Sequence, residues 1–135
     1  KMLDPEFNKG IEVIVLPNLY GDIVTDVAAE HQGGLGTASS SNLGNQYAMF
    51  EAIHGTAPFL IDHNRGDYAD PCSLIRAVGM LMAHIGYADR KQILDQALDI
   101  CTITERRLVV TTDRDGASAA EFTDYLLETI DGLKK

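Results

Sequence analysis

Apolar residues form a compact run near the start of the chain, in residues 11–16 (IEVIVL). The run is rich in β-branched residues and almost wholly apolar, which is typical of a strand buried on both faces of an α/β sheet. Pro17 ends the run, and Asn18 is suited to cap a helix. From Tyr20 onward apolar positions recur at helical spacing. We therefore expect a strand followed directly by a helix.

The helical periodicity returns three times in the second half of the chain. It predicts a helix over residues 72–87, with Pro71 near its start, and another over residues 90–104. Ser118 is expected to cap a last helix that ends near Ile130. These helices should pack their apolar stripes inward.

Shorter segments connect these helices. Residues 47–53 predict a strand, residues 107–112 predict a short strand or extended segment, and residues 113–116 predict a turn. Residues 32–44 carry so many glycines and serines that we expect a loop, with Gly36 as a candidate for close approach of the backbone to a ligand. The pattern as a whole predicts an α/β fold, with a largely parallel sheet flanked by helices, in one domain over residues 1–135.

Composition and charge argue against some classes of function. With 135 residues and a net charge of −9, the chain lacks the basic footprint that nucleic acid requires. It has neither an apolar run near membrane-spanning length nor a signal-peptide pattern at its start, so we expect a cytoplasmic protein that does not enter a membrane. Cys72 and Cys101 lie in apolar helical contexts and are expected to be buried thiols.

The first candidate for chemistry is a pair of aspartates. Asp22 and Asp26 lie four residues apart, so both face the same side of the expected helix. Paired carboxylates are hard oxygen ligands that favour a cation such as Mg²⁺. The alternative is that they only complement the dipole at the start of the helix.

The second candidate is the segment His54-Gly55-Thr56-Ala57-Pro58, which follows the expected strand. Its small residues and glycine would let the backbone approach a flat, phosphate-bearing ligand. The alternative is a simple turn. The usual glycine-rich fingerprint for dinucleotides, G-x-G-x-x-G after a strand, is missing from the chain, so a nucleotide site here must be built differently.

Two motifs give the chain a resemblance to a known family. Residues 17–26 (PNLYGDIVTD) and residues 50–58 (FEAIHGTAP) together resemble the isocitrate and isopropylmalate dehydrogenases, in the order in which that family carries them. The resemblance implies that Asp22 and Asp26 hold Mg²⁺ or Mn²⁺, which binds the substrate. It also implies that His54, Gly55, Thr56, Ala57 and Pro58 cradle the adenosine part of NAD or NADP.

The chain departs from the family's pattern over residues 59–71, which are longer by a few residues. Asp62 could accept hydrogen bonds from ribose hydroxyls, as NAD requires, whereas His63 or Arg65 could bind the 2′-phosphate of NADP. The choice between NAD and NADP therefore stays open. By resemblance Asp70 is a contact for the adenine and Arg114 a further phosphate candidate. The alternative for each is an ordinary surface residue.

The resemblance implies an oxidative decarboxylation of a small 2-hydroxy acid, as in the tricarboxylic acid cycle, from isocitrate to 2-oxoglutarate. The chain corresponds to the C-terminal portion of such an enzyme. The family's catalytic tyrosine, lysine and substrate-binding arginines match nothing here, so no catalytic residue is assigned and we expect the fragment alone to be inactive. A homodimer with a shared active site is also implied.

The sequence is compatible with several other functions. The chain could belong to a non-catalytic regulatory subunit or nucleotide-binding module of the same fold, to a homoisocitrate or isopropylmalate dehydrogenase, or to a purely structural domain. A mitochondrial matrix is an alternative to the cytoplasm.

Overall fold

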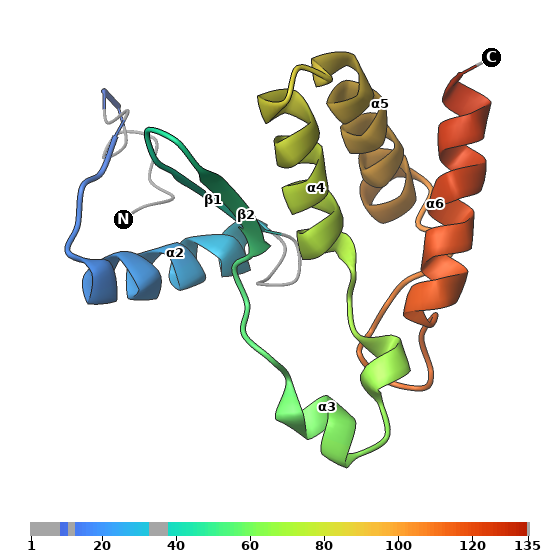
Figure 1. The fold of residues 1–135 in the computed structure, drawn as a ribbon. Helices are drawn as coiled ribbons and strands as arrows, with labels where there is room; N and C mark the ends of the chain where they lie inside the picture. The colour runs from blue at the N-terminus through green and yellow to red at the C-terminus, as the bar shows by residue number, and fades with distance from the viewer. Residues whose placement is uncertain (1–8, 11–12, 33–37, 135) are drawn as a thin grey trace.

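The computed structural model describes residues 9–10, 13–32 and 38–134 (Figure 1). Along this part of the chain the elements are α2 (Asn18–Gln32), β1 (Ser39–Leu43), β2 (Ala48–Ala52), α3 (Pro58–Asp62), the 3₁₀ turn η2 (Gly66–Tyr68), α4 (Cys72–His84), α5 (Ala88–Asp99), the π-helical turn η3 (Ile100–Thr104) and α6 (Ala119–Leu133). Gly36, the loop candidate for ligand approach, lies outside the described residues.

The sheet in the described residues is a hairpin of β1 and β2, paired antiparallel with Ser41 opposite Phe50. The α/β class is confirmed, but the largely parallel sheet is corrected here. The physical reason is the short connection, closed by a hydrogen bond from Gly44 N to Tyr47 O at 2.9 Å, because parallel neighbours need a crossover of a dozen residues or more. Ser39–Leu43 also corrects the loop expected over residues 32–44.

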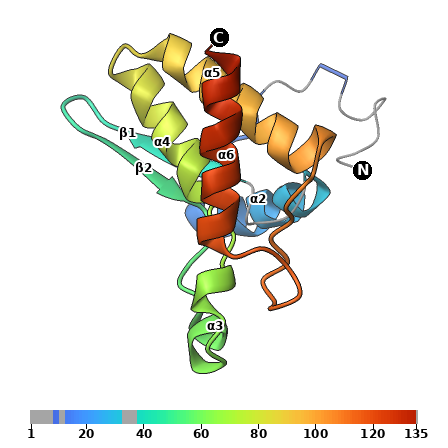
Figure 2. The same cartoon turned by 90° about the vertical axis from the view of Figure 1, so that its right-hand side faces the viewer.

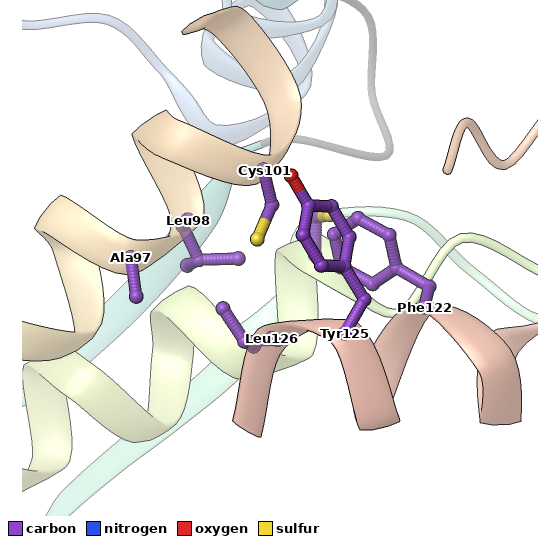
Figure 3. Packing of buried hydrophobic residues seen from close by; sticks show 7 residues of the cluster. Ala97, Leu98, Cys101, Phe122, Tyr125 and Leu126 are labelled. Atoms are coloured by element: carbon purple, nitrogen blue, oxygen red, sulfur yellow. The ribbon is translucent and has the colours of Figure 1, made fainter. Parts of the chain in front are cut away.

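The core lies between α4, α5 and α6, which stand side by side in both views (Figures 1 and 2). Figure 3 shows side chains of α5, η3 and α6 converging on one cluster. The buried members of the cluster are Cys72, Ala97, Leu98, Cys101, Phe122, Tyr125 and Leu126. Because α4 also packs against β1 and β2, this core supports the hairpin.

The three helices form where the periodicity predicts them, but the inward packing expected of their apolar stripes is corrected for α4, which leaves Leu74, Val78 and Leu81 exposed. The helix expected over residues 90–104 forms as α5 and continues as η3. Ser118 caps α6 through a capping box, in which its hydroxyl accepts from the backbone of Glu121 while the Glu121 carboxylate accepts from the backbone of Ser118. The hydrogen bonds that the Ser118 backbone and hydroxyl donate to this carboxylate lower the pKa of Glu121 below its usual value.

Two expected strands do not form. Within residues 11–16, only Val13 to Leu16 are described, and they are exposed and unpaired, with Val15 at 88% exposure. Residues 107–112 form no strand either. A strand needs a neighbour to satisfy its backbone, and no described strand runs beside either segment. None of the described helices combines the length and apolar character needed to cross a bilayer.

Candidate functional site

Helix α2 presents the two candidate metal ligands. It begins at Asn18, and Gly21 N donates to Pro17 O at 2.9 Å, which closes its first turn. Asp22 and Asp26 lie beyond that first turn and are exposed. Since the field of a helix terminus fades within one turn, complementing the dipole does not account for the pair. What remains is two carboxylates on the same side of one helix.

A cavity of about 390 Å³ brings this pair next to the second motif. Its walls come from α2, the hairpin and the segment after β2. The lining residues are Asp22, Thr25, Asp26, Ser40, Glu51, Ala52, Ile53, His54 and Gly55. The structure therefore joins the two motifs at one cavity, although they are separated by the whole hairpin along the chain.

Glu51 is a member of this cavity to which the sequence analysis gave no role. It lies on β2 opposite Ser40, and its carboxylate accepts from Asn42 Nδ2 at 2.9 Å. Its signal in the sequence was a lone acidic residue within the largely apolar run of residues 48–53. With Glu51, three carboxylates face the cavity. Anionic ligands such as a polycarboxylate or a dinucleotide would be repelled unless a cation neutralised part of this charge.

The donors fit a divalent ion of the magnesium type. Asp22 and Asp26 offer exposed carboxylate oxygens one turn apart, and Mg²⁺ commonly keeps several waters and takes only one or two protein carboxylates. Within the described residues, no group of three or more His, Cys, Asp or Glu side chains is placed to hold a metal. Any ion held by these two carboxylates would therefore need water or another ligand to complete its coordination.

The segment after β2 is well placed to meet a ligand. All of residues 54–58 are exposed, and the His54 ring lies with Nδ1 3.0 Å from Gly55 O. No side chain of the described residues fills the space that Gly55 would need for a Cβ, so the backbone there is open to close approach. Thr56 and Ala57 lead to Pro58, which starts α3.

Asp70 has a structural partner. Its Oδ1 accepts from Cys72 N at 2.9 Å, which satisfies a backbone donor in the first turn of α4. Burial, followed by the hydrogen bond and charge of Asp70, raises the pKa of the Cys72 thiol. Cys72 and Cys101 are both buried and free, as expected, and both line a second cavity of about 180 Å³ together with Asp70. Asp70 is thus separated from the first cavity's lining.

The candidates for recognising the ribose or its phosphate are placed differently from one another. Asp62 ends α3 and is exposed. The His63 ring stacks on Phe59 with 4.1 Å between ring centroids, and its Nδ1 lies 2.8 Å from Phe59 O. Arg65 donates a hydrogen bond to the Thr112 carbonyl and forms a salt bridge with the Asp113 carboxylate. The Arg114 side chain donates a long hydrogen bond, at 3.4 Å, to Asn64 O.

Comparisons with known proteins agree with the two motifs. The profile described as isocitrate/isopropylmalate dehydrogenase matches residues 3–130. A mitochondrial protein of Dictyostelium discoideum, named as a regulatory subunit of NAD isocitrate dehydrogenase, is 43% identical over 131 residues, which is 96% of this chain and 35% of that protein. The NADP isocitrate dehydrogenase of Rickettsia felis is 49% identical over 86 residues, 64% of this chain and 17% of that protein.

A solved structure shares the fold as well. The isocitrate dehydrogenase of Methylococcus capsulatus superimposes with a TM-score of 0.75 at 34% identity, over 84% of this chain and 33% of that chain. The chain therefore spans about a third of the length of these proteins or less.

Proposed function

Because the chain belongs to the isocitrate and isopropylmalate dehydrogenase family, we propose that it forms the metal- and dinucleotide-binding part of a dehydrogenase that oxidatively decarboxylates a 2-hydroxy acid. The substrate we propose is isocitrate, with NAD or NADP as the hydride acceptor, because relatives of both cofactor types carry the name isocitrate dehydrogenase. The observation that supports this best is the cavity that joins Asp22 and Asp26 to His54 and Gly55.

Each residue of the cavity has a proposed role. Asp22 and Asp26 would hold Mg²⁺ or Mn²⁺, which when bound supplies Lewis acidity to the oxygens of the substrate. The loop of residues 54–58 would hold the adenosine part of the dinucleotide. The described lining contains neither lysine nor tyrosine, the pair that the family resemblance implies for proton transfer. We therefore propose that the chain alone binds its ligands without turning over substrate.

The test is a steady-state assay of the full-length protein that carries this chain. Isocitrate, homoisocitrate and isopropylmalate are each offered with NAD and with NADP, in Mg²⁺ or Mn²⁺. We expect isocitrate to reduce one cofactor, and a chelator to abolish the reaction. Turnover that survives complete removal of divalent ions would contradict the proposed role of the aspartates.

The metal site has its own matched test. An Asp22→Asn, Asp26→Asn double variant should lose Mn²⁺ binding in a calorimetric titration, because amides carry no charge for the ion. The control is Asp124→Asn with Glu128→Gln, a carboxylate pair at the same spacing on α6 and outside the cavity lining. Equal loss of Mn²⁺ binding in both double variants would show that only general surface charge attracts the ion.

A second function is favoured by one comparison. The Dictyostelium relative, which matches 96% of the chain, carries a name that describes a regulatory role. Such a role predicts that the full-length protein binds a dinucleotide but stays silent with all three substrates. The name of that relative also places it in mitochondria. We therefore propose the mitochondrial matrix as an alternative to the cytoplasm for the compartment of this protein. A homodimer with a shared active site remains part of the proposal, testable by mixing two inactive variants.

A further inference from the structure

We propose that Arg65 is a positioning residue for the dinucleotide, because it fastens the end of α3 to the turn at residues 111–116 and thereby holds the loop of residues 54–58 in place. We call these contacts the Arg65 clasp: the Arg65 guanidinium, the Thr112 carbonyl and the Asp113 carboxylate. The inference rests on the proposed function, since it takes residues 54–58 as the dinucleotide loop.

The loop and the elements after it have little packing of their own. Residues 54–59 are all exposed, and neither α3 nor η2 contains a buried residue. Figure 1 shows α3 extending away from the helical core, joined to the rest by the stretches of chain on either side of it. Segments with so few buried contacts open locally at low cost in free energy. Apart from the packing of η2 against α6, their position must therefore depend largely on a few polar contacts.

The Arg65 clasp is the strongest of these contacts. Arg65 Nε donates to Thr112 O at 2.9 Å, Nη2 donates to the same oxygen, and Nη2 lies 3.3 Å from Asp113 Oδ2. The guanidinium carbon also lies 5.7 Å from the centre of the Phe59 ring. The Arg65 side chain is only 20% exposed, so its charged hydrogen bonds are partly shielded from water.

The turn that receives Arg65 is firmly held. Ala117 N donates to Val109 O at 2.9 Å, which closes the turn at its base. A Cβ on Gly116 would lie 2.8 Å from Thr111 N and 2.9 Å from Val109 O, so this position requires glycine.

The backbone of Thr112 adds a second sign of constraint. Its φ of 62° is rare for a β-branched residue and persists only where surrounding contacts impose it. The turn runs directly into Ser118 and α6, which belongs to the core. Arg65 therefore connects the segment that follows the loop of residues 54–58 to a turn anchored on the helical core.

The same contacts argue against a direct role for Arg65 in binding the 2′-phosphate of NADP. Its Nε and Nη2 already donate to Thr112 O, and its charge is already paired with Asp113. A direct bond to a 2′-phosphate would have to come from Nη1 or break these contacts, because the charge and the other donors are directed at Thr112 and Asp113. A positioning role predicts that Arg65 matters equally for NAD and NADP, whereas a direct role predicts an effect on NADP alone.

The test measures dinucleotide affinity in the full-length protein by calorimetry, separately for NAD and NADP. We expect Arg65→Ala to weaken the binding of whichever dinucleotides bind by about tenfold, through loss of the charged hydrogen bonds. Arg65→Lys, which can still pair with Asp113, should recover part of that loss. In steady-state assays the KM for the dinucleotide should rise while kcat stays unchanged, and Mn²⁺ affinity should not move.

The matched control is Arg76→Ala. Arg76 pairs with Asp99 at 3.2 Å with side chains 28% and 55% exposed, close to the 3.3 Å and the 20% and 56% of Arg65 and Asp113, but it bridges α4 and α5. It should leave dinucleotide affinity unchanged.

Three results would overturn the inference: unchanged affinity in Arg65→Ala, weaker binding of NADP while the binding of NAD by the same protein is intact, or an equal loss in Arg76→Ala. If Arg65→Ala does not fold, Asp113→Asn replaces it, with a loss of about threefold expected. Absence of dinucleotide binding by the unaltered protein would instead overturn the proposed function, and the inference with it.

Discussion

Helices α5 and α6 contribute large, fully buried apolar side chains to the core, whereas α2, which carries the two aspartates, leaves most of its own exposed. Leu98 and Phe122 are 0% and 2% exposed, while Leu19 and Ile23 of α2 are 67% and 53% exposed. The candidate functional residues thus lie in the part of the chain that buries fewer large apolar side chains. Stability and the proposed binding functions should therefore respond to different substitutions.

The largest effect should come from a pair of leucines that contrast the two regions. Leu98→Ala removes a fully buried side chain and should lower the free energy of unfolding by about 2–5 kcal/mol. Leu19→Ala makes the same chemical change on an exposed face of α2 and should cost less than about 0.5 kcal/mol. Urea denaturation followed by circular dichroism measures both. Equal losses would mean that α2 belongs to the cooperative core.

A smaller effect is expected at the cap of α6. Ser118→Ala removes the hydroxyl that accepts from Glu121 N, while the backbone N–H of residue 118 can still donate to the Glu121 carboxylate, and should destabilise the protein by about 1 kcal/mol. Ser118→Asp, which keeps an acceptor for the helix backbone, should recover most of that stability. Thermal unfolding of the two variants measures the difference. Because this cap belongs to the helical core, Ser118→Ala should leave Mn²⁺ binding at Asp22 and Asp26 unchanged.

Alkaline pH should weaken the core through one phenol. Burial, and then a hydrogen bond from Tyr125 to Glu105 at 2.7 Å, raises the pKa of Tyr125 from 10.0 to about 12. The unfolded chain loses this proton first, so the contribution is complete below pH 10 and is lost as the pH rises from 10 to about 12.

The variant Tyr125→Phe isolates this contribution. Because it has no ionisable group at this position, its unfolding free energy should fall less steeply than that of the unaltered protein across the same pH range. At neutral pH it should cost about 1 kcal/mol for the lost hydrogen bond. Parallel slopes for the two proteins would show that Tyr125 ionises as freely in the fold as outside it.

The smallest effect should have the opposite sign. In metal-free buffer, the Asp22→Asn, Asp26→Asn double variant should be more stable by about 0.2–0.5 kcal/mol, because like charges one turn apart repel each other. Urea denaturation with chelator present measures the gain. A loss of stability would mean that the aspartates stabilise the fold. The residues proposed to bind the metal would then also be residues that stabilise the protein.

The sequence could predict the helical region because its signals are local. Apolar periodicity located α4 and α5, and Ser118 followed three residues later by Glu121 marks the start of α6. Strands depend on distant partners instead. Ser39–Leu43 looked like a loop by composition, yet it pairs with β2, while residues 13–16 looked like a strand and pair with nothing described.

The candidate site divides in the same way. The spacing of Asp22 and Asp26 and the small residues after His54 are visible in the sequence, so their chemistry could be proposed in advance. Their meeting at one cavity required the hairpin to form, and that also brought in Glu51. The pairing of Arg65 with Thr112 spans 47 residues and has no local signature, so only the structure reveals it.

The exposed run at residues 13–16 has a consequence for how this chain behaves in concentrated solution. Val13, Ile14 and Val15 are 79%, 56% and 88% exposed, and short β-branched segments of this kind add to one another as strands in aggregates. The net charge of −9 opposes such self-association by mutual repulsion between molecules. Salt screens that repulsion beyond about 10 Å at 0.1 M. The isolated chain should therefore stay dispersed at low ionic strength and precipitate as salt is added.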